Sequence, residues 1–536
     1  MSDPKISLHW TAPPQAKELM EELVADGVAS GIASRDATLW GPEAESEAGK
    51  RLAWVGLAQE SRPLVDEVIG LRDVLADRGL GHVVLCGMGG SSLAPEVICA
   101  THGVDLTVLD SSDPDVVRRA LADRLEQTVV VVSSKSGGTV ETDSQRRAFE
   151  KAFADADLEP AAHIVVVTDP GSPLDELAAE AGYRVFHADP EVGGRYSALT
   201  AFGLVPSGLA GADIGRLLDE AAAVQPALEE DDPTNPALFL GALLGGANRA
   251  GADKVVLADH GSGIPGFGDW VEQLIAESTG KDGKGILPVV VPSVDAPNFS
   301  PATPDEVLVT LGREADAVEA PSGWSATVDA PLGAQMLLWE YATVVAGRLI
   351  GINPFDQPDV ESAKQAARDN LDGGGESPEP VFTDGGVEVY ATDGLLSEET
   401  TLADAVSTLL GEIDPEHGYL AVMAYLDRIG EAELAEVREH LAVRTGRPTT
   451  FGWGPRFLHS TGQYHKGGPP TGVYLQLTAE PQADLEIPDR PFSFGTFIQA
   501  QAVGDASVLA EHGRPVLRLH LTDPSSGLEA VRDVLR

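Results

Sequence analysis

Two segments rich in glycine and small hydroxyl residues follow apolar runs early in the chain, and each could bind an anion. The first is CGMGGSSLAPEV, where Gly89 and Gly90 allow a tight turn and Ser91 stands where a helix is expected to begin. Unsatisfied N–H groups at a helix N-terminus bind phosphate without a cationic side chain. An ordinary capped turn is one alternative. A dinucleotide-binding turn is another, since Asp110 follows about 20 residues later, although Ser92 replaces the third glycine of that motif.

The second segment is SSKSGGTVET, directly after the apolar run TVVVV. Ligands of parallel sheets bind outside the carboxyl ends of the strands, so Ser134, Ser136 and Thr139 can converge with Ser91 on one phosphate. Lys135 adds a positive charge in a strongly acidic chain, although a single lysine is more often a solvated surface residue. Because two strand-end loops agree, phosphate binding is favoured over the dinucleotide interpretation.

Arg195 and Glu277 are the candidates for charged catalytic groups. Arg195 follows two glycines in VGGRYSALTAFGL, and its planar, permanently charged guanidinium could hold a phosphate or a developing oxyanion; an ordinary ion pair is the alternative. Gln273 and Glu277 are i and i+4 in GDWVEQLIAESTGKDGKG, so they lie on one face of the expected helix. Apolar and small neighbours could desolvate the Glu277 carboxylate and allow it to act as a base, although helical glutamates are common.

The elements that must position these residues are short β-branched runs that alternate with helical stretches. Such continuous apolar runs are typical of parallel sheets covered by helices on both faces. The expected strands of a first sheet are 82–86, 106–110, 128–132, 163–167 and 183–189, and those of a second are 254–259, 286–291 and 306–311.

The pattern therefore predicts the α/β class, with two doubly wound parallel-sheet domains, extra helices and a C-terminal extension. Residues 1–212 are expected to hold an N-terminal segment and the first domain, and 213–253 a helical connector. Residues 254–446 are expected to hold the second domain, with a mobile loop near 368–386 that is rich in Gly, Pro and acidic residues. Residues 447–536 are expected to pack on the second domain.

Composition excludes several classes of partner. Among 536 residues, 84 are Asp or Glu and 37 are Lys or Arg, a formal charge of −47 with no basic stripe, so no nucleic-acid partner is expected. No apolar run approaches the roughly 20 residues of a membrane helix, and two cysteines are too few for a disulfide framework. We therefore expect a cytoplasmic protein without a membrane partner. No His and carboxylate cluster has metal-ligand spacing, so neither a metal nor another cofactor is expected.

Five motifs in order, GMGGSS, SSKSGGTVET, VGGRYS, WVEQLIAESTGK and DQPDVESAK, together resemble the glucose-6-phosphate isomerase family. The chain is most similar to the bacterial form that also occurs as the isomerase part of transaldolase/isomerase fusions. The resemblance implies two flavodoxin-like sugar-isomerase domains. It also implies reversible isomerisation of glucose 6-phosphate and fructose 6-phosphate through a cis-enediolate, a reaction of glycolysis and gluconeogenesis. The implied partners are a small-molecule sugar phosphate and a second copy of the chain.

The resemblance also implies roles for individual residues. Glu277 would move the proton between C1 and C2, Arg195 would stabilise the enediolate, and Lys364 would assist opening of the sugar ring. The residues implied in phosphate binding are Ser91, Ser134, Lys135, Ser136, Thr139 and Gln273.

A ring-opening histidine is the least regular part of the resemblance. The segment STGQYHKGG is closest to the family's G-Q-H pattern and implies His465, although it follows Lys364 in the chain instead of preceding it; His459 is the rival. In relatives this histidine crosses from the partner subunit, which implies a homodimer with shared active sites.

Two other functions remain open at this point. A noncatalytic sugar-phosphate sensor, or an isomerase of another phosphosugar, would keep the hydroxyl loop, and a sensor would not need Glu277. An NAD-dependent oxidoreductase would use the first glycine turn together with Asp110.

Overall fold

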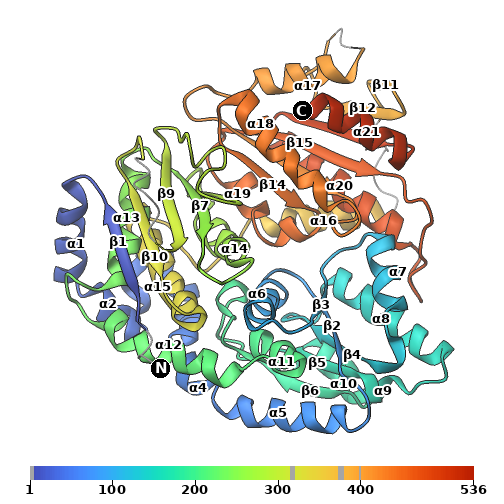
Figure 1. Ribbon diagram of the computed structural model, residues 1–536, viewed down its shortest axis with the longest axis horizontal. Coiled ribbons are helices and arrows are strands. Elements are labelled where there is room, and N and C mark those ends of the chain that lie inside the picture. Colours follow the sequence, from blue (N-terminus) through green and yellow to red (C-terminus); the bar gives the residue numbers. More distant parts are fainter. Residues whose placement is uncertain (1–4, 314–319, 372–378, 398–399) are drawn as a thin grey trace.

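The computed structural model describes residues 5–313, 320–371, 379–397 and 400–536, which form three sheets covered by helices. Figure 1 shows the three sheet units arranged around a common centre, with helix α14 (Phe267–Thr279) close to α6 (Leu93–His102) and α19 (Gly462–Gly467). The predicted α/β class is confirmed.

The first unit contains the predicted five-stranded parallel sheet in the order β3-β2-β4-β5-β6. Alternate valines of its central strands enter two cores: Val129 packs with one set of helices and Val130 with the opposite set. Both faces are therefore buried, which explains why the strands are continuous apolar runs. The strands are β2 (His82–Gly87), β3 (Thr107–Leu109), β4 (Thr128–Ser133), β5 (Ile164–Thr168) and β6 (Arg184–His187). The helices are α5 (Pro63–Ala76), α6, α7 (Pro114–Ala122), α8 (Val140–Asp155), α9 (Pro160–His163), α10 (Pro173–Ala181) and α11 (Ala201–Ala210).

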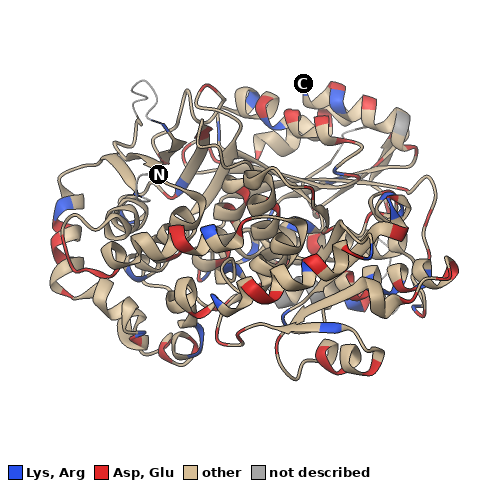
Figure 2. Ribbon diagram, turned by 60° about the horizontal axis from the view of Figure 1, so that its bottom comes forward, with Lys and Arg blue, Asp and Glu red and all other residues tan. Residues whose placement is uncertain are grey.

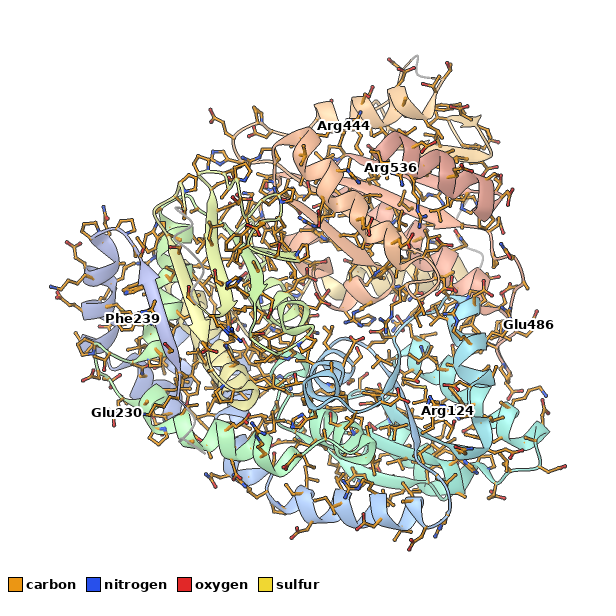
Figure 3. The ribbon with its side chains drawn as sticks, viewed as in Figure 1. Arg124, Glu230, Phe239, Arg444, Glu486 and Arg536 are labelled. Carbon is orange, nitrogen blue, oxygen red and sulfur yellow. The ribbon has the colours of Figure 1, made fainter. Side chains whose placement is uncertain are left out.

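The second unit has a sheet in the order β1-β10-β9-β7-β8, and its edge strand β1 comes from the N-terminus and runs antiparallel to β10. Trp10 of β1 packs edge to face on Phe239, with ring centroids 4.7 Å apart. Phe239 is labelled in Figure 3, where it lies beside β1. The N-terminal strand therefore belongs to the second sheet and not to the first. The strands are β1 (Ser7–Thr11), β7 (Lys254–His260), β8 (Leu287–Val291), β9 (Glu306–Gly312) and β10 (Ser325–Asp329). The helices are α1 (Gln15–Ala25), α2 (Val28–Ala33), α3 (Glu45–Arg51), α4 (Leu57–Glu60), α12 (Ile214–Glu229), α13 (Pro236–Arg249), α14 and α15 (Leu332–Ile350).

The third unit has a sheet of its own, in the order β11-β12-β16-β15-β13-β14, and this sheet runs across the boundary that the sequence predicted at residue 446. The strand at 419–425, which lies within the predicted second domain, thus pairs with later strands and not with the second sheet. The strands are β11 (Phe382–Asp384), β12 (Val387–Ala391), β13 (Tyr419–Tyr425), β14 (Thr449–Trp453), β15 (Gly472–Ala479) and β16 (Val516–Leu521). The helices are α16 (Val360–Leu371), α17 (Leu402–Gly411), α18 (Val437–Thr445), α19, α20 (Phe494–Glu511) and α21 (Pro524–Leu535).

The segment predicted to be a mobile loop, 368–386, is only partly described. Its first residues end helix α16, its last residues form β11 and the following turn, and 372–378 lie outside the described residues. Acidic side chains are spread over the helices of the chain and interspersed with basic ones (Figure 2). Within the described part of the chain, no helix is both long and apolar enough to cross a membrane.

Two arginines of the third unit bind two carboxylates of the first. Arg456 lies 2.6 Å from Asp110 and 2.5 Å from Glu96, and Arg428 lies 3.2 Å from Asp110 and 3.4 Å from Glu96. Burial would raise the pKa of Glu96, but the two guanidinium groups outweigh it and lower that pKa. The oxidoreductase alternative requires an Asp110 carboxylate that a ribose can reach. The Asp110 side chain is instead fully buried in this cluster.

Candidate active site

The first glycine turn packs against two other parts of the candidate site. A short 3-10 turn, η3 (Gly89–Ser91), follows β2, and a second one, η5 (Gly194–Tyr196), lies against it. A Cβ atom at Gly90 would lie 1.9 Å from the carbonyl oxygen of Gly194. Gly89 has a φ of +58°, and a Cβ atom there would lie 2.8 Å from Nε2 of Gln273. Neither position has room for a side chain, so glycine is required at both. The close packing of the two turns brings Ser91 beside the turn that carries Arg195.

The second hydroxyl loop is folded tightly at the carboxyl end of β4. Oγ of Ser134 and Oγ1 of Thr139 are 3.0 Å apart, and the N–H of Gly138 donates to Oγ of Ser136 at 3.3 Å. Gly137 has a φ of +69°, and a Cβ atom there would lie 2.7 Å from the backbone nitrogen of Leu174. Thr139 is the N-cap of α8, so the loop leads into the positive end of that helix dipole. This is a suitable place for an anion.

Lys135 of the same loop forms an ion pair with a carboxylate outside the loop. Its Nζ lies 2.7 Å from Oδ2 of Asp169 and 3.3 Å from the carbonyl oxygens of both Asp189 and Pro190. Burial lowers the pKa of Lys135, and Asp169 opposes that change. The lysine thus fastens the loop to its neighbours, and its charge is balanced by Asp169.

Arg195 is buried, and every nitrogen of its guanidinium is a donor. Nε donates to Oγ of Ser278 at 2.8 Å, and Nη2 donates to the carbonyl oxygens of Pro354 and Asp356 at 2.8 and 3.0 Å. Nη1 donates to the side-chain oxygen of Gln357 and lies 3.6 Å from Oε2 of Glu277. The guanidinium is therefore fixed in position next to the Glu277 carboxylate.

Gln273 and Glu277 lie on the same face of α14, as predicted from their spacing. Nε2 of Gln273 is 3.5 Å from Oε2 of Glu277 and donates to the carbonyl oxygen of His459 at 2.8 Å. Glu277 is only 7% exposed. Oε1 of Gln273 is buried and has no hydrogen-bond partner among the described residues. The carboxylate thus lies in a largely dry environment beside a cation, which suits an acid–base group.

His459, the rival histidine, joins the two parts of the site. It ends the 3-10 turn η7 (Arg456–His459), which follows β14 in the third unit. Its Nε2 lies 3.1 Å from Oε1 of Glu141, and Nε2 of Gln501 donates to the same oxygen at 2.8 Å. Since Glu141 follows the hydroxyl loop at the start of α8, His459 connects that loop with Gln273 and Glu277.

His465 lies in a different environment. It is 3% exposed, with Nδ1 at 3.1 Å from Oη of Tyr419 and its carbonyl oxygen accepting from Tyr474 at 3.0 Å. Burial, with a smaller effect of Lys466, lowers the pKa of His465 to about 3. The structure brings His465 into contact with this tyrosine cluster, whereas it brings His459 to the predicted site residues.

A cavity of about 290 Å³ opens beside the hydroxyl loop. Helix α16, which carries Lys364, supplies one wall, but the side chain of Lys364 lies outside the described residues. The cavity is lined in part by Ser136, Thr139, Glu141, Arg368, Phe497 and Gln501.

The sequence interpretation missed four of these groups, one of which is Arg368 of α16. Glu141 stands inside the quoted motif SSKSGGTVET, and its place in the first helical turn was an available signal. Gln501 and Phe497 lie in the C-terminal region, where no motif marked them. Across the described ranges, no group of three or more His, Cys, Asp or Glu side chains is placed to hold a metal ion.

The fold and site together define an α/β protein in which a hydroxyl loop, a histidine and a buried carboxylate–arginine pair meet between three sheet units. The family profile described as phosphoglucose isomerase matches residues 67–286. The probable glucose-6-phosphate isomerase of Natronomonas pharaonis is 30% identical over 339 residues, which cover 54% of this chain and 79% of the relative. The chain belongs to the glucose-6-phosphate isomerase family.

A second relative and a solved structure show how much of each protein is similar to this chain. The glucose-6-phosphate isomerase of Cyanothece sp. is 32% identical over 348 residues, which cover 54% of this chain but only 65% of that relative. The chain therefore spans slightly less than two thirds of the length of this relative. A hypothetical protein of Thermus thermophilus has a similar structure, with a TM-score of 0.58 and 26% identity, covering 68% of this chain and all of that one.

Proposed function

We propose that this chain catalyses the reversible conversion of glucose 6-phosphate and fructose 6-phosphate by proton transfer through a cis-enediolate. The observation that carries the proposal is the continuous line of contacts from Glu277 through Gln273 and His459 to Glu141 beside the hydroxyl loop. A ligand whose phosphate lies on that loop would present its carbon chain toward the Glu277 carboxylate. Family membership supports the same reaction.

In the proposed mechanism the phosphate end is an anchor and takes no part in the chemistry. Neutral hydroxyls and backbone N–H groups bind it, which fixes the sugar at one end and orients its first two carbons. Gln273 would lie between this end and the base. The hydroxyl donors are Ser91, Ser134, Ser136 and Thr139.

Glu277 acts as the base that removes a proton from one carbon and returns it to the next. Arg195 stabilises the negative charge that develops on the enediolate oxygens. Because Ser278, Pro354 and Asp356 already hold its guanidinium, little reorganisation is needed when that charge appears.

Ring opening is assigned to His459 in place of His465, with Lys364 as a further participant. His459 contacts Glu141, whose carboxylate can orient the imidazole. His465 is neutral near pH 7 because its pKa is lowered to about 3, and it cannot gain and lose a proton there.

The homodimer with shared active sites and the cytoplasmic location predicted from the sequence remain proposals. His459 of the third unit contacts Gln273 of the second unit within the same chain, one turn of helix from Glu277. A homodimer would therefore not have to exchange this histidine.

Coupled assays of both reaction directions test the proposal. Purified protein is expected to convert each hexose phosphate into the other and to incorporate deuterium at C2 of glucose 6-phosphate when the reaction is run in ²H₂O. A protein that binds both sugar phosphates but converts neither, with no label exchange, would be the noncatalytic sensor.

The two histidines are distinguished by a matched pair of variants. His459→Gln is expected to lower kcat/KM by about 10²-fold, since loss of a general acid–base group typically costs that much or more. His465→Gln is expected to lower the unfolding temperature and to leave kcat/KM of the folded fraction within about threefold, because its side chain contacts Tyr419 and not the site. If His465→Gln melts like the wild type but loses activity, while His459→Gln remains active, the assignment is reversed.

A further inference from the structure

We propose that Arg368 of helix α16 supplies the cationic contact for the phosphate group of the substrate. The inference rests on the proposed function and deepens it, because it names the residue that selects phosphorylated over neutral sugars. Neither the sequence motifs nor the family resemblance assigned Arg368 a role.

The position of Arg368 is the first argument. Its side chain lines the same cavity of about 290 Å³ as Ser136, Gly138 and Thr139 of the hydroxyl loop. These groups come from elements far apart in the sequence, since α16 follows the second unit and the loop lies in the first. An anion seated on the loop hydroxyls in a cavity of this size would lie within reach of a guanidinium in its wall.

The charge around the loop is the second argument. Lys135, the cation within the motif, is already paired with Asp169. Glu141 adds a negative charge to the cavity wall, and the whole chain carries a formal charge of −47. A phosphate dianion held only by neutral hydroxyls would be opposed by this field. An arginine offers a permanent charge and paired donors that match phosphate oxygens.

The packing of α16 is the third argument, because it determines where Arg368 lies. A Cβ atom at Gly504 of α20 would lie 2.9 Å from the backbone nitrogen of Ala367, so the two helices touch directly beside Arg368. One turn earlier in α20, the carbonyl oxygen of Ala500 accepts a hydrogen bond from Nδ2 of Asn370 at 3.5 Å. The arginine thus extends from a helix whose backbone is packed against α20.

Steady-state kinetics of Arg368→Ala test the inference. A lost hydrogen bond to a charged group corresponds to an increase of about 10- to 100-fold in KM for glucose 6-phosphate. The inhibition constant of inorganic phosphate, the probe for the anion alone, is expected to rise by a similar factor, and kcat is expected to stay within about threefold. Arg368→Lys is expected to recover part of the affinity, because the charge remains but the paired donors are lost.

Arg444→Ala is the matched control, since it removes the same charge from an exposed position on α18, and Arg444, labelled in Figure 3, is not among the residues that line the cavity. It is expected to leave KM and phosphate inhibition unchanged. An unaltered KM and phosphate constant in Arg368→Ala, or equal changes in both variants, would overturn the inference. Calorimetric titration of inorganic phosphate separates this failure from that of the proposed function, because it reports on Arg368 even if the wild-type chain isomerises neither sugar.

Discussion

Glu277→Gln is expected to lower kcat for both reaction directions by about 10³-fold, within the range observed when a general acid–base group is removed. The amide keeps the size of the side chain and its place beside Gln273 and Arg195, but it cannot accept the proton from the sugar carbon. Phosphate inhibition is expected to remain normal, because the hydroxyl loop is untouched. Stopped-flow or long-time coupled assays measure the residual rate.

Glu272→Gln is the matched control for this variant. Glu272 lies on the same helix but lines another cavity, of about 390 Å³, together with Trp453 and Arg456. The kcat of Glu272→Gln is expected to remain within about threefold of the wild-type value. Full activity in Glu277→Gln would show that another group is the base, even if the reaction itself were confirmed.

Arg456→Met is expected to destabilise the folded chain by about 3–5 kcal/mol, the usual cost of removing one partner from a buried ion pair. Asp110 has a fully buried side chain and would keep only Arg428 as a cationic partner. Arg456 also opens the 3-10 turn that ends at His459, so activity is expected to fall together with stability. Urea unfolding followed by circular dichroism measures the change in midpoint.

Arg119→Met provides the comparison, because Arg119 joins the same two units through Asp427 but is 45% exposed. An exposed ion pair contributes at most about 1 kcal/mol, so a small change in midpoint is expected. Equal losses in the two variants would mean that burial of the Arg456 cluster adds nothing to the contact between the units.

Most strands of the first two sheets were predictable because both of their faces are covered. Such strands must be apolar throughout, and the runs at 82–86, 128–132 and 163–167 could be recognised for that reason. Strands β1 and β10 were missed, since each lies near a sheet edge, is only five residues long and alternates between more and less exposed positions. The predicted boundary at residue 446 divided the third sheet between two regions, because no local sequence signal determines which sheet a strand joins.

The parts of the site that lie in compact motifs were predictable, whereas contacts between units were not. The i and i+4 spacing placed Gln273 and Glu277 on one face, and the structure shows the same arrangement. Lys135 illustrates the limit: its motif indicates a cation near the anion, but its partner Asp169 lies on a neighbouring strand-end loop. Likewise, motif similarity favoured His465, and only the packing of the third unit brings His459 to Glu141.

The pairing of β1 with β10 also has a consequence for biosynthesis. Residues 7–11 leave the ribosome well before their hydrogen-bonding partners, residues 325–329, because residues 12–324 must be translated between them. Until then the leading segment lacks its native neighbour, and afterwards it covers an otherwise open sheet edge. Truncation of these few amino acids would therefore leave the nascent product prone to association through that edge.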